Sequence, residues 1–174
     1  MLIDDFSGEE LFSPVGSKRR GVRDRVMGGI SIAGVTSDVL DGQTCLRLAG
    51  DIRTENGGGF IQASLSFSTD GEHLDATYFV GIRLSLCGKA EMHSVHIHTP
   101  DCGRPWQSYR SQSRAQPQWE TVTLPLTSFE PHHLESPLDE SRLTRIGLVA
   151  FGRPFRANLA VSEIAFYKMQ YPFA

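Results

Sequence analysis

The sequence predicts an all-β fold, a β-sandwich or jelly roll, on three observations. Several short runs alternate apolar and polar side chains with a period of two, as strands with one packed face do. Glycine-containing turns separate these runs at short intervals. No long stretch carries the 3.6-residue period of an amphipathic helix. Many short strands joined by tight turns are typical of two packed sheets.

The expected strands follow one another along the whole chain. Strands with one packed face are predicted at residues 61–67, 80–86, 95–98 and 122–126. The runs Arg145–Phe151 and Leu159–Tyr167 are apolar at both parities, which predicts strands covered on both sides. Pro125 lacks an N–H, so its strand is expected at a sheet edge or a bulge. Helix is limited to one or two turns at residues 9–12 and 138–143.

Size and composition indicate one globular domain. The chain has 174 residues, enough for a single core but short for two ordinary domains, and no linker or repeat divides it. We therefore expect residues 1–174 to form one domain. The formal net charge is −3, whereas nucleic-acid binding relies on a surplus of Lys and Arg. No nucleic-acid partner is expected.

Targeting signals and cysteines point to the cytoplasm. No run approaches the ~20 apolar residues of a membrane span, and Met1–Asp5 lacks the basic and apolar parts of a secretory signal. We expect a cytoplasmic protein that does not insert into a membrane and reaches one only through a partner. Cys45, Cys87 and Cys102 are odd in number and form no C-x-x-C pair, which favours reduced thiols. Cys102, in a turn near Arg104, is the candidate for reactivity; an inert surface thiol is the simpler interpretation.

Three histidines in one run raise the question of a metal site. His96 and His98 share one face of their expected strand, and His93 takes the other. Two imidazoles on one face hold zinc only when a third ligand joins them, and no zinc motif supplies one. We therefore predict neither metal nor cofactor, and we expect these histidines on a solvated sheet face.

That face is nevertheless a candidate binding surface, provided that neighbouring strands pair in register. Its expected lining is Gln62, Arg83, His96, His98 and the strand Trp106–Arg110 with Tyr109 and Arg110. Aromatic rings beside Arg and His side chains suit a sugar or a peptide, through stacking and directed hydrogen bonds. For catalysis the sequence offers neither a G-x-S-x-G motif nor a local Cys–His pairing. The domain is expected not to be an enzyme.

Two glycine segments are further candidates for contact with a partner. Their residues are Arg23, Asp24, Met27, Gly28, Gly29, Gly59 and Phe60. Adjacent glycines permit positive φ or a close approach of the backbone to a ligand. The alternative is structural: a bend and a hairpin loop that only shape the fold, with Asp24 accepting hydrogen bonds from turn N–H groups.

The segment Val22–Ser31 (V-R-D-R-V-M-G-G-I-S) resembles the most recognisable motif of the complex I intermediate-associated protein family. Four further segments match that family in the same order, namely Gly58–Phe60, Pro105–Arg110, Trp119–Phe129 and Ile146–Leu148. One position departs: the family usually has Trp three residues before the valine, and here it is Arg19. The opening Leu2–Phe6 is also similar to the first strand of carbohydrate-binding jelly rolls.

The resemblance implies a galactose-binding-like β-sandwich. For mitochondrial members it also implies a role in assembling respiratory complex I, the NADH:ubiquinone oxidoreductase. The expected function is a non-catalytic, chaperone-like assembly factor that binds subunits or intermediates of such a complex. The alternative is a module that binds carbohydrate or another small ligand, and a third hypothesis is a hydrolase or redox enzyme. Jelly rolls host all three, so the fold alone does not decide.

Overall fold

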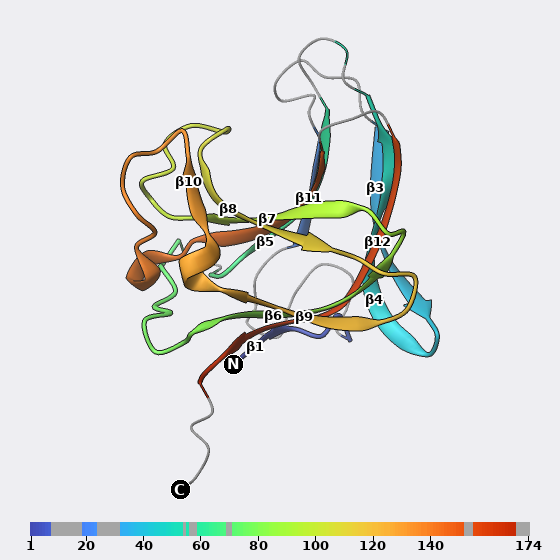
Figure 1. Cartoon of the computed structure of the whole chain (residues 1–174), viewed down its shortest axis with the longest axis horizontal. Helices are drawn as coiled ribbons and strands as arrows, with labels where there is room; N and C mark the ends of the chain where they lie inside the picture. Colours follow the sequence, from blue (N-terminus) through green and yellow to red (C-terminus); the bar gives the residue numbers. More distant parts are fainter. Residues whose placement is uncertain are drawn as a thin grey trace, which may run out of the picture.

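The computed structural model describes residues 1–7, 19–23, 32–53, 55, 59–68, 71–151 and 155–169, with backbone alone at 19–23, 32–33 and 155. These residues form two six-stranded sheets in which every pairing is antiparallel (Figure 1). The all-β prediction is confirmed. The helical elements with described bounds are two 3₁₀ turns, Leu126–Ser128 and Glu140–Arg142. Among the described residues, no helix has the length and apolarity needed to cross a membrane.

We call the first layer sheet 1. Its strand order is β3-β4-β12-β6-β9, and β1 pairs with β12 near the end of that strand. Its strands are β1 (Leu2–Asp4), β3 (Ile32–Leu40), β4 (Gln43–Ile52), β6 (Gly81–Gly88), β9 (Glu120–Pro125) and β12 (Phe155–Tyr167). The two predictions for this sheet are confirmed, since β12 has buried residues at both parities, such as Leu159 and Ala160, and β9, which ends at Pro125, is an edge strand.

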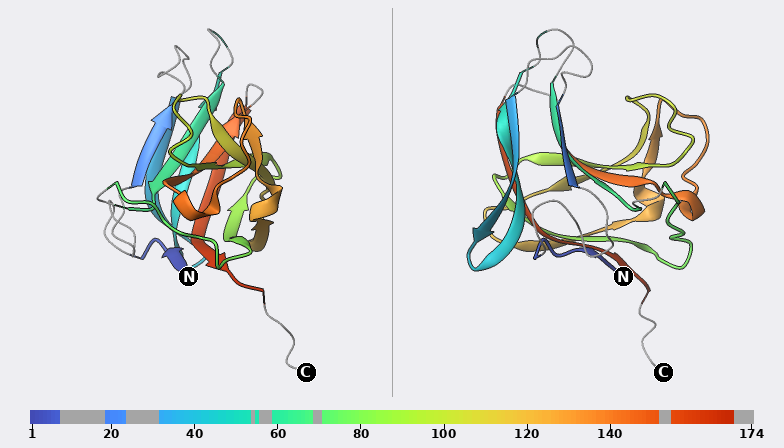
Figure 2. Two further views of the ribbon diagram at one scale, coloured as in Figure 1. Left: turned by 90° about the vertical axis from the view of Figure 1, so that its left-hand side faces the viewer. Right: turned by 180° about the vertical axis from the view of Figure 1, so that it is seen from behind.

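The second layer is sheet 2, with strand order β10-β8-β7-β11-β5-β2. Its strands are β2 (Arg19–Arg23), β5 (Phe60–Ser66), β7 (Met92–His98), β8 (Ser108–Arg114), β10 (Glu130–His132) and β11 (Arg145–Phe151). β11 is central, as its apolar composition predicts, and β7 lies between β11 and β8. Figures 1 and 2 show sheet 2 bent, with β10 and the segment before β8 rising at one end.

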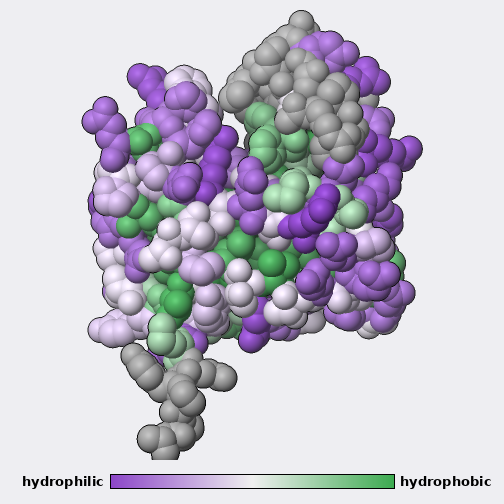
Figure 3. Space-filling view, in the orientation of Figure 1, coloured by the Kyte–Doolittle hydropathy of each residue, from purple (hydrophilic) through white to green (hydrophobic). Residues whose placement is uncertain are grey.

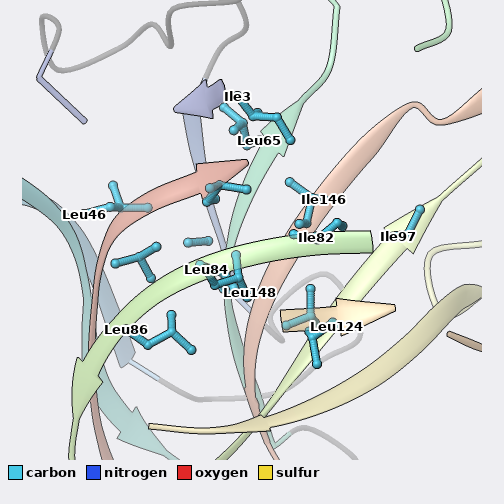
Figure 4. Packing of buried hydrophobic residues seen from close by; sticks show 14 of the residues in the cluster. Ile3, Leu46, Leu65, Ile82, Leu84, Leu86, Ile97, Leu124, Ile146 and Leu148 are labelled. Carbon is cyan, nitrogen blue, oxygen red and sulfur yellow. The ribbon is translucent and has the colours of Figure 1, made fainter. Parts of the chain in front are cut away.

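The core lies between the two sheets and explains the alternation in the sequence. Ile82, Leu84 and Leu86 of β6 point toward Ile146 and Leu148 of β11, and all five are nearly inaccessible to solvent (Figure 4). Burying each such side chain contributes about 1.5–3 kcal/mol. In Figure 3, hydrophobic residues form a band across the side of the molecule between β7 and β9, with hydrophilic residues around it. The packed faces are therefore those that period two predicts.

A short turn fastens the segment that rises beside sheet 2. The Asp139 carboxylate accepts a hydrogen bond from the Ser141 N–H at 3.0 Å and from Arg142 Nε at 2.7 Å. Arg142 Nη2 also lies 3.4 Å from the Asp101 carboxylate, which joins the turn to the segment before β8. The turn expected at 138–143 is confirmed; the one expected at 9–12 lies outside the described residues.

Candidate functional site

Alternate residues of sheet 2 point away from the core and form the outer face of this sheet. Val95 and Ile97 of β7 pack in the core, which places their neighbours His96 and His98 on the opposite face. By register, the outer face of sheet 2 comprises Phe60, Gln62, Ser64, Ser66, Ser94, His96, His98, Ser108, Arg110, Gln112, Glu130, His132, Arg145, Gly147, Val149 and Phe151. Most of these side chains are polar, although most of them belong to the four central strands of the sheet.

The two histidines of this face are buried. The prediction that they share a face is confirmed, but the expectation of a solvated position is wrong, because His96 is 8% exposed and His98 4%. Their strand has a neighbour on each side, and Arg145 of β11 stands opposite His98. Burial, with a smaller contribution from nearby guanidinium groups, lowers the pKa of each imidazole to about 3. Both rings are neutral near pH 7.

Two arginines accompany the histidines. Arg145 Nη2 lies 3.2 Å from His98 Nδ1. Arg110 stands opposite His96, and it donates to Ser108 Oγ at 2.8 Å and to the Trp106 carbonyl at 3.2 Å. Burial lowers the pKa of both guanidinium groups. We call His96, His98, Arg110 and Arg145 the cationic cluster.

The middle of the face is hollowed. Gly147 lies between Ser64 and His96 in the sheet, and a Cβ at position 147 would overlap the side-chain amide of Gln62. The missing side chain thus makes room for Gln62 beside the cationic cluster. A cavity of about 370 Å³ opens next to it, over the edge of β8. It is lined by Ser94, Arg110, Ser111, Gln112, Ser128, Glu130, Pro131, His132 and Phe151.

Two residues expected on this face lie elsewhere. Arg83 belongs to β6 of sheet 1, where it forms an exposed ion pair with Glu163 at 2.7 Å. Tyr109 is fully buried in the core, and its hydroxyl group reaches the Pro137 carbonyl at 3.2 Å. Tyr109 precedes Arg110 on one strand, so the two side chains necessarily take opposite faces. Trp106 lies before β8 and is 46% exposed.

The glycine-segment candidates are only partly described. Gly59 is buried, with φ of +127°, a conformation that favours glycine. Phe60 opens β5 as expected and pairs with Phe151 of β11. The backbone of Arg23 pairs with Ile61 at the end of β2. The side chain of Arg23 and the predicted contacts Asp24, Met27, Gly28 and Gly29 lie outside what the structure describes.

Sequence reasoning missed Arg145, His132 and Phe151. The signal for Arg145 and Phe151 was present, because both share the parity of Gly147 in a strand whose other parity is apolar. His132 follows Pro131 in β10, a strand of three residues that is too short to show a period. It pairs with Ser108, which brings it beside the cationic cluster.

A larger hollow, of about 560 Å³, lies on sheet 1 around Arg83 and Glu163. These two charges neutralise each other there. Within the described residues, no three His, Cys, Asp or Glu side chains are grouped to hold a metal ion. All three cysteines are free, with Cys45 and Cys87 buried and Cys102 partly buried. Among the described residues, five buried side-chain polar atoms lack a hydrogen-bond partner, namely His93 Nε2, His96 Nε2, His98 Nε2, Ser113 Oγ and Trp119 Nε1. The outer face of sheet 2 is the candidate site, because it brings two of them, those of His96 and His98, beside the half-buried Arg110 and Arg145.

The sheets and their connections define a galactose-binding-like jelly-roll module, and solved structures of such modules share the fold. A family 11 carbohydrate-binding module of a Clostridium thermocellum cellulosomal cellulase has a TM-score of 0.72 and 13% identity, over 97% of this chain and 94% of that one. The same kind of module in complex with a β-1,3-1,4-mixed-linked tetrasaccharide has a TM-score of 0.70 and 14% identity, over 96% and 94%. A family 30 module from Clostridium thermocellum has a TM-score of 0.65 and 13% identity, over 98% and 99%.

Sequence comparison gives the family. Residues 6–161 match the family of complex I intermediate-associated protein 30 (CIA30). The chain belongs to this family, as its motifs predicted. A search of curated proteins finds no significant match.

Proposed function

We propose that this domain is a non-catalytic assembly factor that binds a segment of a respiratory-complex subunit on the outer face of sheet 2. Membership of the CIA30 family supports an assembly role connected with complex I. The choice of surface rests on two buried imidazole nitrogens, His96 Nε2 and His98 Nε2, which have no hydrogen-bond partner among the residues that the structure describes. A buried polar atom without a partner costs about 1–3 kcal/mol, which a bound partner removes.

The mechanism is reversible covering of a surface. Sheet 2 is held by its core, so the backbone of its outer face is formed before a partner arrives, and only the side chains that cover His96 Nε2 and His98 Nε2 must move for a partner to reach them. An assembly intermediate exposes surface that its later subunits will cover. The domain binds that surface through the polar face, and it leaves when the next subunit competes for the same contacts. No bond is made or broken in this cycle.

The second candidate is a carbohydrate-binding module, and the shared fold with two families of such modules favours it. Sugar rings commonly stack on Trp or Tyr side chains. On the described part of the outer face the aromatic side chains besides histidine are Phe60 and Phe151, while Tyr109 is in the core. The described strands of the face therefore offer hydrogen-bonding groups without a Trp or Tyr platform, and the exposed Trp106 lies beside them, before β8; this arrangement favours a protein segment.

Affinity capture tests this proposal. Full-length tagged protein is purified from its own cells, and subunits of NADH:ubiquinone oxidoreductase are identified by mass spectrometry. We expect capture by the unaltered protein and by Arg83→Gln, whose change lies on sheet 1. We expect Arg110→Gln, on the outer face of sheet 2, to lose it.

The opposite result is informative as well. Equal capture by both variants would mean that the partner lies elsewhere on the molecule. Binding to immobilised glycans that Arg110→Gln abolishes, without capture of any complex I subunit, would replace the assembly role by the carbohydrate-binding one.

A further inference from the structure

The charges of the cationic cluster are unbalanced. Three other arginines of the described chain, Arg47, Arg83 and Arg142, form ion pairs with carboxylates within 3.4 Å. The half-buried Arg110 and Arg145 have none within the described residues, and their contacts are with neutral acceptors. Glu130 of β10 is the register neighbour of Arg110, but the two form no ion pair, and Arg145 has no acidic register neighbour. A buried charge normally requires a partner more strongly than an exposed one does, so an anion is the group that would pair with Arg145.

The tautomer of His98 adds a donor to the same place. A guanidinium group only donates, so His98 Nδ1 must accept the hydrogen bond from Arg145. With a pKa of about 3 the ring is neutral, and its proton is then on Nε2. That N–H is buried and has no acceptor in the described part of the chain. His96 Nε2, two residues away on the same strand, is likewise buried without a partner there.

We propose that the cationic cluster binds a carboxylate group, presented by an acidic side chain of an extended partner segment. Arg145 and Arg110 supply the charge, and His98 Nε2–H supplies a directed donor. This inference rests on the proposed function, because it names the chemistry of the partner at that same face.

The residues at the other end of the outer face of sheet 2 indicate which second side chain the partner segment should have. Phe60 and Phe151 pair across β5 and β11, and Phe151 is 36% exposed. Phe151 is six residues from Arg145, the register partner of His98, so the apolar end lies about 20 Å from these two residues of the cluster. An extended peptide covers the same distance in six residues. The matching segment thus has an apolar side chain six positions from its acidic one.

The probe is a capped peptide, Gly-Leu-Ser-Thr-Ser-Thr-Ser-Glu-Gly, titrated into the full chain by calorimetry and followed by the imidazole ¹⁵N signals. A matched peptide has Gln in place of Glu. We expect the Glu peptide to bind about tenfold or more tightly than the Gln peptide, as hydrogen bonds to a charged group do. Its binding should move the His98 Nε2 signal.

Protein variants locate the effect. Arg145→Gln should remove the preference for Glu, whereas Arg83→Gln, an equal loss of charge on sheet 1, should retain it. Equal affinity of the two peptides would overturn the proposal, and so would a preference that Arg145→Gln retains. If Arg145→Gln does not fold, the His98 signal of the unaltered protein decides instead, since a Glu peptide that leaves it unchanged excludes the site.

Three further outcomes distinguish the class of the partner, the carboxylate site and the assembly role from one another. D-Glucuronate oligomers that bind more tightly than the peptide would overturn the assignment to a protein segment. A Glu preference without capture of complex I subunits would support the carboxylate site and refute the assembly role. Capture that depends on Arg110, with no preference for Glu, would support the role and refute the carboxylate.

Discussion

Acidification from pH 8 to pH 5 should weaken the fold through two buried histidines. The pKa of His96 and of His98 is about 3 in the folded chain, against about 6.5 when unfolded. Between these values the unfolded chain binds the additional protons, so stability is full above pH 6.5 and is lost as the pH falls toward 3. At pH 5 the loss is about 2 kcal/mol for each histidine.

The magnitude is large enough to measure. Two histidines together remove about 4 kcal/mol, a substantial share of the roughly 5–15 kcal/mol that stabilises a typical domain. Hydrogen bonding lowers the pKa of Asp75 and Asp139, and their contribution is lost only near and below pH 4. The interval from pH 8 to pH 5 therefore isolates the histidines.

The assay is urea unfolding at both pH values, for the unaltered chain and for the double variant His96→Gln/His98→Gln. We expect the unaltered chain to lose about 4 kcal/mol more than the variant between pH 8 and pH 5. Comparing the two changes removes any constant cost of the substitutions, and it cancels the contribution of His93, whose pKa burial also lowers. Equal losses in the two proteins would refute the burial of these rings.

Three further outcomes follow from the packing. Gly81→Ala should cost about 1–3 kcal/mol, because its Cβ would overlap the Leu124 carbonyl and the Tyr167 ring. Gly34→Ala, with open space around the new Cβ, should instead gain about 0.5–1 kcal/mol; similar melting shifts in both would refute the packing around Gly81. Tyr109→Phe should lower the free energy of unfolding by about 1 kcal/mol, because the hydrogen bond to the Pro137 carbonyl is lost, and it should leave capture of complex I subunits unchanged. Loss of capture would show that Tyr109 contributes to the binding face.

The sequence predicted the fold well because period two is a local signal. The alternation in β6, the edge position of the strand that ends at Pro125 and the central position of β11 are all set by residues within one strand. The shared face of His96 and His98 came from the same rule.

The composition of the site was harder to predict, because it depends on which strands become neighbours. Arg83 has the polar parity of a binding residue, but nothing within its strand indicates that β6 joins the other sheet. Arg145, whose guanidinium group contacts His98 Nδ1, is 47 residues away in the chain. Tyr109 is different: its parity relative to Arg110 was visible in the sequence and was not applied.

One measurement tests most directly that the outer face of sheet 2 is the binding surface. A benzophenone amino acid is introduced at Gln112, exposed on that face, and separately at Thr123, exposed on β9 of sheet 1. After irradiation in living cells, we expect a crosslink to a complex I subunit from position 112 and none from position 123. A crosslink from position 123 alone would place the partner on sheet 1 and contradict the account.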